Sequence, residues 1–412
     1  MDAQDPLAKY RERFHLPRDS AGQLLRYFCG HSLGLQPRHA RDYVLEEMDA
    51  WQRLGVEGHF AGERPWFLYH ERLTPGLALL AGAQPSEVVA MNSLTVNLHL
   101  MLASFFRPTI SRYKILIERS AFPSDRYAVV SQLQWHGLDI QNALIEIGPR
   151  PGEDTLRQED IEDALARDGA QIAVVLLPGV QYLTGQCLDM AKITHTAQRH
   201  GCVVGFDLAH AIGNVSLALH DWNVDFAVWC SYKYLNGGPG AIGGCFVHDR
   251  HTRMDDLPRL AGWWGHDKYS RFAMPEQFKP IVGAEGWQIS NPSILSAAPL
   301  VAALEIFVEA DVAPLRTKSV QLTSLVAHLV RDRLRERVTI VTPLEQQSRG
   351  AQLSLRLHTD PRHAKSVHAR LVAAGFICDW REPDILRIAP VPLYNTHQEV
   401  WQLVDTLLGI LD

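Results

Sequence analysis

Short runs of apolar residues alternate with longer amphipathic stretches through the middle of the chain. The runs 114–118 (KILIE), 172–177 (IAVVLL) and 202–206 (CVVGF) have the length of strands and lack polar alternation. The stretches 159–169 and 189–201 carry apolar residues at helical spacing, and each ends on a glycine. Strands that are apolar on both faces and alternate with helices are typical of a mostly parallel sheet covered on both sides. We therefore predict an α/β fold for this region.

The pattern changes toward the C-terminus. Residues 319–337 form a long amphipathic pattern, and leucines alternate with polar residues over 351–358. A further helix is predicted over 363–375, followed by a strand at 376–380 (FICDW). This mixture indicates a small α+β lobe. We predict an N-terminal segment that packs with the small domain, a large α/β domain and a small C-terminal domain, with bounds 1–50, 51–285 and 286–412.

Composition narrows the class of protein. The chain has 412 residues, of which 46% are hydrophobic and 21% charged, as in a globular enzyme of two lobes. The net charge is −6 and no basic run is present, so a nucleic-acid partner is not expected. The longest apolar run, 172–180, is too short to cross a membrane. The first residues lack the charged and then apolar segments of a signal peptide. We expect a cytoplasmic protein without a membrane partner.

The cysteine and histidine spacings give no metal-binding motif. None of the six cysteines forms a C-x-x-C pair, and no H-E-x-x-H sequence occurs among the nineteen histidines. We interpret the cysteines as small buried hydrophobes in a reducing compartment and predict no metal site.

Two predicted strands are followed by residues with ionisable side chains that can take part in catalysis. The strand 202–206 is followed by Asp207 and then His210, and Lys233 follows a buried run, 26 residues after Asp207. Ligands of open α/β sheets bind beyond the carboxyl ends of strands. Pyridoxal phosphate needs both groups, because its aldehyde binds an amine and its ring nitrogen stays protonated beside a carboxylate. The sequence therefore predicts this cofactor.

Other segments supply the rest of such a site. Ser93 and Thr95 precede a helix-like stretch, where phosphate is favoured, while Phe122 offers a ring for stacking and Asp125 lies beside it. Taken singly, an aspartate after a strand is more often a cap, a lysine is usually a solvated charge, and a phenylalanine is usually core. Their occurrence together and in this order favours a cofactor site.

Longer sequence motifs that include these residues resemble those of a known family. FDLAHAIGNV (206–215), LHDWNVDFAVWCSYKYLNGG (219–238) and EGWQISNPSI (285–294) closely resemble kynureninases, which are pyridoxal-phosphate enzymes of fold type I. The resemblance spans about residues 27–400. Further matching words are HSLGLQP (31–37), GHFAGERPW (58–66), NSLTVNLH (92–99), AFPSD (121–125), GWWGH (262–266) and RIAPVPLYN (387–395).

The resemblance implies a fold and an activity. The fold-type-I architecture has a large domain with a mostly parallel, seven-stranded sheet and a smaller α+β domain. The family hydrolyses the Cβ–Cγ bond of L-kynurenine to anthranilate and L-alanine, in tryptophan degradation and the pathway toward NAD. Some members prefer 3-hydroxykynurenine and release 3-hydroxyanthranilate, and the sequence leaves this preference open. The family also implies a homodimer with shared active sites.

The resemblance also assigns roles to residues of this chain. The catalytic residues that it implies are Lys233, which also binds the cofactor, Tyr232, which transfers protons, and Asp207, the partner of the pyridine nitrogen. The implied cofactor contacts are Leu94, Thr95, Phe122, Asp125, Asp207, His210, Tyr232, Lys233, Trp264 and Asn291. The implied substrate contacts are Arg387 at the α-carboxylate, Ser32 and His59 near the aromatic end, and Asn291. In the family, the second subunit contributes Trp264 and Asn291.

Two positions depart from the family pattern, and three alternatives stay open. His31 stands where the family often has asparagine, and Pro178 stands where a serine is common. The alternatives are a cysteine desulfurase, an aminotransferase or a catalytically silent homologue that binds a partner. A desulfurase needs a cysteine on a mobile loop, and Cys378, the only candidate by position, lies in an apolar run that predicts burial.

Overall fold

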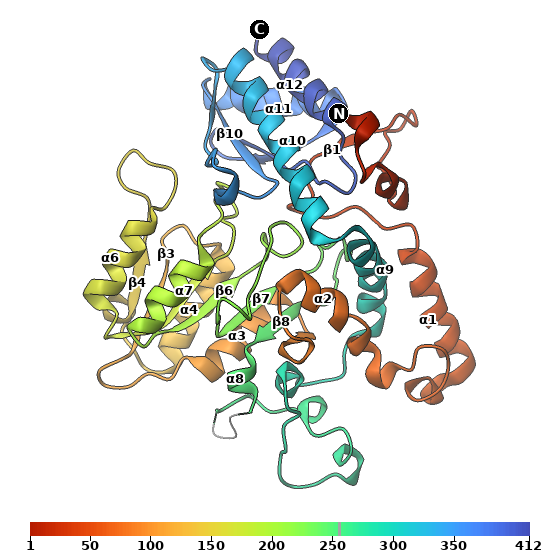
Figure 1. Cartoon of the computed structure of the whole chain (residues 1–412), viewed down its shortest axis with the longest axis vertical. Coiled ribbons are helices and arrows are strands. Elements are labelled where there is room, and N and C mark those ends of the chain that lie inside the picture. The colour runs from red at the N-terminus through yellow and green to blue at the C-terminus, as the bar shows by residue number, and fades with distance from the viewer. Residues whose placement is uncertain (254–256) are drawn as a thin grey trace.

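The computed structural model describes residues 1–253 and 257–412, and a seven-stranded sheet forms its centre (Figure 1). The strand order is β2-β8-β7-β6-β5-β3-β4. The strands from β7 to β4 are parallel, while β8 pairs antiparallel with both β7 and β2. The bounds are β2 Val88–Ala90, β3 Lys114–Glu118, β4 Leu144–Ile147, β5 Ile172–Pro178, β6 Val203–Asp207, β7 Phe226–Trp229 and β8 Gly244–Val247.

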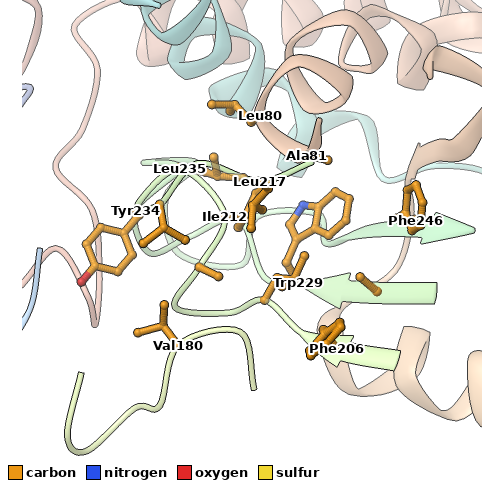
Figure 2. Packing of buried hydrophobic residues seen from close by; sticks show 14 of the residues in the cluster. Leu80, Ala81, Val180, Phe206, Ile212, Leu217, Trp229, Tyr234, Leu235 and Phe246 are labelled. Carbon is orange, nitrogen blue, oxygen red and sulfur yellow. The ribbon is translucent and has the colours of Figure 1, made fainter. Parts of the chain in front are cut away.

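Helices cover both faces of this sheet, as the doubly apolar strands predict. Successive residues of a strand enter different cores: Val175 and Leu177 pack with α6 and α7, whereas Val174 and Leu176 pack on the side of α3 and α4. Figure 2 shows Trp229 of β7 within the first of these cores. The helices of the large lobe are α1 Ala40–Leu54, α2 Thr74–Ala81, α3 Leu94–Phe105, α4 Pro123–Trp135, α5 Ile140–Ala143, α6 Gln158–Asp168, α7 Met190–Arg199, α8 Asp249–Thr252 and α9 Ile294–Ala310.

The small lobe has its own core around an antiparallel sheet of order β12-β13-β10-β9. This core begins within α10, where Leu322 and Val326 are buried. Residue 286, the predicted boundary, comes before α9, which buries its apolar side against α1 and α2 of the large lobe. The bounds are α10 Val312–Arg333, β9 Val338–Ile340, β10 Leu353–Leu357, α11 Pro361–Ala373, β11 Phe376–Ile377, β12 Asp379–Arg381, β13 Ile385–Ile388 and α12 His397–Leu411.

The N-terminal segment contacts both lobes rather than the small one alone. Its strand β1 (Arg26–Tyr27) pairs with β11, and Asp2 accepts hydrogen bonds from the backbone and the ring of His397. Helix α1, in contrast, packs on α9. The chain from Cys29 to Leu35 thereby crosses the junction between the two lobes.

The predicted strand over 376–380 is two strands in two sheets. β11 pairs in parallel with β1, whereas β12 pairs antiparallel with β13. Cys378 lies between them and is buried, as its apolar surroundings predict. All six cysteines are free and five of them are buried. Within the two described ranges, no helix combines the length and the apolar character that crossing a membrane requires.

Candidate active site

A pocket opens at the carboxyl edge of the large sheet, and the predicted strand-end residues meet there. Asp207 ends β6, Glu118 ends β3, and Lys233 follows β7 by four residues. Because these strands are parallel, their carboxyl ends lie at one edge. The pocket is lined by Leu94, Thr95, Ile117, Glu118, Ala121, Phe122, Ser124, Asp125, Leu176, Leu177, Pro178, Val180, Tyr182, Asp207, Ala209, His210, Tyr232 and Lys233.

Lys233 points its amine at groups suited to a planar ligand. Its Nζ lies 3.1 Å from Nε2 of His210, 5.9 Å from the ring centre of Phe122 and 5.8 Å from that of Tyr232. Burial, and then the charge of Lys233, lowers the pKa of His210 well below its usual value. The histidine is therefore neutral, and its Nε2 can accept a hydrogen bond from the ammonium. The ring of Phe122 is 46% exposed in the pocket, as expected for a surface that a ligand covers.

Asp207 and Asp125 form an interacting pair of carboxyl groups. Both are buried, and an oxygen of Asp207 accepts a hydrogen bond of 2.6 Å from the backbone N–H of Ala209. Burial, and then the adjacent Asp207, raises the pKa of Asp125 well above its usual value. Burial therefore favours the protonated form of Asp125, and its Oδ1 has no hydrogen-bond partner among the described residues. This pair can face a protonated ring nitrogen.

The first turns of two helices form another wall. Leu94 and Thr95 open α3, Ser124 lies in the first turn of α4, and the two hydroxyl groups are 2.8 Å apart. Unpaired backbone N–H groups and the helix dipole favour phosphate at such ends. The pocket thus combines an amine, a carboxylate pair, a stacking ring and phosphate donors, so its residues fit pyridoxal phosphate.

Glu118 is a pocket residue that the sequence reasoning missed. It is 4% exposed, and its Oε2 has no partner among the described residues. Burial raises the pKa of its carboxyl group to about 7. Its place as the last residue of an apolar strand is the same signal that identified Asp207, and it could have been used here too.

This pKa shift predicts a pH-dependent stability. Folding raises the pKa of Glu118 from 4.5 to about 7, so the folded state holds the proton more tightly. The associated stability is fully present below pH 4.5 and is lost as the pH rises through 7, a loss of roughly 3 kcal/mol. Glu118→Gln should remove this loss from the cofactor-free protein. Thermal unfolding measured between pH 5 and 8 tests this. The exposed variant Glu57→Gln should keep the wild-type slope, and an unchanged slope in Glu118→Gln would refute the assignment.

Arg387 lies in β13 of the small lobe and is 1% exposed. Its Nε lies 2.6 Å from Oδ2 of Asp379, and its Nη1 donates to the backbone carbonyl of Tyr182, 205 residues away in sequence. The Tyr182 ring meets Phe122 edge-on at 5.4 Å, so the arginine adjoins the pocket wall. These contacts still leave one hydrogen on each terminal guanidinium nitrogen, which is the fork that a carboxylate requires.

Besides Arg387, four predicted site residues do not line this pocket. Ser32 is exposed, in the turn between Cys29 and Leu33. His59 packs edge-on against Trp66 at 5.4 Å. Trp264 is buried against Phe67 and Arg271, and Asn291 is exposed. Within one chain these four residues therefore contribute nothing to the lining around Lys233.

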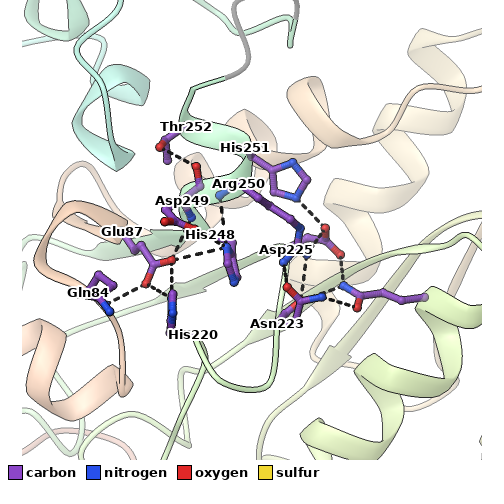
Figure 3. A network of polar contacts seen from close by, with 11 residues as sticks. Gln84, Glu87, His220, Asn223, Asp225, His248, Asp249, Arg250, His251 and Thr252 are labelled. Atoms are coloured by element: carbon purple, nitrogen blue, oxygen red, sulfur yellow. Dashed lines mark hydrogen bonds and ion pairs between the residues drawn. The ribbon is translucent and has the colours of Figure 1, made fainter.

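Among the described residues, two clusters have the composition of cation sites, and neither includes a residue that lines the pocket. Figure 3 shows the first, where ligand atoms of Glu87, His220, His248 and Asp249 lie within 4.8 Å of one another. The buried Glu87 carboxylate there already accepts hydrogen bonds from His220 and from the backbone of Gln84 and Asp249. The second cluster, with Glu71 and Glu285, holds the ammonium of Lys268 against both carboxylates. Internal hydrogen bonds and an ion pair thus account for both, and the absence of a metal site stays a prediction.

The sequence of this chain matches known proteins of one family. The model of the kynureninase C-terminal domain matches residues 315–407. The chain is 55% identical to the kynureninase of Koribacter versatilis (strain Ellin345), covering all of this chain and 96% of that protein. It is 55% identical to the kynureninase of Myxococcus xanthus (strain DK1622), covering 99% and 95%.

Solved structures show the same fold at low identity. The cystine C-S lyase C-DES, in complex with cysteine persulfide, superposes with a TM-score of 0.77 at 18% identity, covering 93% of this chain and 97% of that one. The cysteine desulfurase CsdA of Escherichia coli gives 0.76 at 18% identity, covering 98% of both chains. Another structure of the lyase carries glycine covalently linked to its PLP cofactor. The predicted α/β architecture is thereby confirmed. With more than half of its residues identical to full-length relatives, this chain belongs to the kynureninase family.

Proposed function

We propose that this protein is a pyridoxal-phosphate-dependent hydrolase that cleaves L-kynurenine at the Cβ–Cγ bond and releases anthranilate and L-alanine. Family membership at 55% identity carries this proposal, and the pocket around Lys233 supplies the groups that the reaction needs. The reaction belongs to tryptophan degradation. When bound, the cofactor draws electrons from the substrate Cα and so allows its proton to leave.

Lys233, Asp207 and Phe122 are the residues that hold the cofactor in this proposal. The amine of Lys233 would bind its aldehyde, the carboxylate of Asp207 would keep its ring nitrogen protonated, and the Phe122 ring would stack on it. Burial and the neighbouring Asp207 favour the protonated form of Asp125, which lowers the negative charge beside the ring nitrogen. The first turns of α3 and α4 supply N–H and hydroxyl donors to its phosphate.

Proton transfer falls to Lys233 and Tyr232. The amine at the carboxyl edge of β7 is suited to removing the Cα proton, since His210 holds its Nζ at 3.1 Å. Burial raises the pKa of Tyr232 far above its usual value, and nearby Cys230 and Asp207 raise it further. The phenol therefore keeps its proton at neutral pH and serves as a donor. One water enters the products, because the acyl carbon leaves as a carboxylic acid.

A desulfurase reaction is not supported by the cysteines. Cys378 is buried and lies between two strands, and burial raises the pKa of its thiol well above the usual value. A nucleophilic thiolate requires an exposed site and a low pKa. The likeness to desulfurases therefore concerns the fold.

The direct test is product formation by the purified protein loaded with pyridoxal phosphate. We expect L-kynurenine to give anthranilate, followed by its fluorescence, and L-alanine in equal amounts. Parallel reactions with 3-hydroxy-L-kynurenine and L-cysteine measure substrate preference and desulfurase activity. Bound cofactor without either aromatic product would overturn the proposal.

We also propose a homodimer with shared active sites. Trp264 lies beside an aromatic cluster in which Phe60 is 58%, Phe272 52% and Trp263 41% exposed. The cluster extends through Phe60 to His59, so His59 and the buried Trp264, two residues that the family places at the active site, both border an exposed apolar surface. Such a surface is typical of an interface.

The expected mass in solution is therefore that of two chains. Light scattering on the active protein measures it. Phe272→Lys should weaken association, because it puts a charge into the apolar surface, and activity should fall with the dimer fraction. The matched variant Tyr127→Lys, on exposed α4, should stay dimeric. An active monomer would contradict the proposal.

We propose a cytoplasmic location as well, which the free cysteines support.

A further inference from the structure

His31 is a buried histidine without a partner. Its side chain is 0% exposed, and neither ring nitrogen has a hydrogen-bond partner among the described residues. A neutral imidazole has one donor and one acceptor, and leaving a buried polar group unsatisfied costs about 1–3 kcal/mol. Such a cost within a folded core calls for a partner that the described residues do not supply, which is either an ordered water or a ligand group.

The backbone on both sides fixes where this ring lies. Cys29 bridges to Ala389, two residues after Arg387, while the backbone N–H of Gly34 donates to the carbonyl of Tyr232 at 2.8 Å. A Cβ on Gly34 would lie 2.3 Å from the carbonyl oxygen of Lys233, so only glycine allows this approach. The segment from Cys29 to Gly34 therefore packs between the strand of Arg387 and the loop of Lys233.

The ring lies close to a residue that lines the pocket, and it lies in a positive field. Its centre lies 6.4 Å from that of His210, the residue that contacts Lys233. Burial, and then Arg387, Lys233 and Arg381, lowers its pKa well below the usual value. Asp379 offsets only one of the two arginine charges. A neutral donor surrounded by excess positive charge is suited to an anionic ligand group.

We propose that His31 is a substrate-binding residue whose ring donates a hydrogen bond to the α-carboxylate of the amino-acid substrate beside Arg387. This inference rests on the proposed function, because that function places an amino acid between Lys233 and Arg387. The family commonly has asparagine here, which also offers an N–H donor. The substitution therefore keeps the donor while changing its reach.

The test compares ligands with and without a carboxylate. L-alanine, the amino-acid product, and decarboxylated kynurenine are titrated into the cofactor-loaded enzyme, and the cofactor absorbance reports binding. His31→Phe fills the volume without a donor and should weaken L-alanine binding roughly ten- to hundredfold. It should leave the affinity of the decarboxylated ligand within about twofold. His31→Asn and His31→Gln should recover most of the L-alanine affinity, and the KM for kynurenine should follow the same order.

His248→Asn is the matched control, because His248 is buried at the opposite edge of the sheet, beyond the end of β8. It should change neither affinity. Equal weakening of both ligands by His31→Phe, or no weakening of either, would overturn the assignment. If His31→Phe does not fold, the smaller donor-free variant His31→Leu is measured in its place and judged by the same two outcomes. Failure of the wild-type enzyme to cleave kynurenine would instead refute the proposed function, since the L-alanine titration does not depend on cleavage.

Discussion

Lys233→Ala is expected to lose kynurenine cleavage by at least about 10³-fold, within the range for the loss of a positioned acid–base group. The same change should abolish the visible absorbance that pyridoxal phosphate acquires on binding a lysine amine. Both losses have one cause. Lys233 is the lysine that lines the pocket, and its Nζ lies between His210 and the ring of Phe122. Initial rates and absorbance spectra measure the two effects.

The control is a lysine that the pocket does not include. Lys192 in α7 is exposed and pairs with Glu162 at 2.7 Å. Lys192→Ala should retain full activity and the absorbance of the bound cofactor. A Lys233→Ala protein that keeps the band, or turns over at more than about a tenth of the wild-type rate, would refute the role of Lys233.

Arg387→Ala is expected to raise the KM for kynurenine by roughly 30-fold or more. Truncating one member of a buried, hydrogen-bonded charge pair costs about 2–5 kcal/mol, and each 1.4 kcal/mol is tenfold. Arg387→Lys should recover little of this, because an ammonium cannot present two parallel N–H donors to a carboxylate. Steady-state kinetics on the folded variants measure KM and kcat.

The effect of losing the ion pair with Asp379 must be separated from the effect of losing the contact between Arg387 and the substrate carboxylate. Arg381→Ala does this, because the Nε of Arg381 lies 3.0 Å from the same Asp379 oxygen while its side chain is 41% exposed. That variant should change KM by less than about threefold. If both arginine variants raised KM equally, Arg387 would act through Asp379 rather than on the substrate.

Local patterns predicted most of the large lobe correctly. The strands β3, β5 and β6 and the helices α6 and α7 lie within a few residues of their predicted positions, because apolar period and glycine stops are local properties of the sequence. Local patterns do not place the lobe boundary, because α9 is apolar enough for either core and only its contacts with α1 and α2 decide where it packs. The run 376–380 was read as one strand because its division between two sheets depends on distant partners.

The sequence by itself determined the kind of site. Asp207 and Lys233 follow buried strands, and in a parallel sheet that fact alone brings them to one edge, whatever the details of packing. Only the tertiary structure decided the charge and the contacts of that site. The raised pKa values of Asp125 and Glu118 and the unpartnered ring of His31 all depend on burial and on neighbours distant in sequence. Desolvation and Coulomb energies depend on three-dimensional distance, which local sequence patterns do not contain.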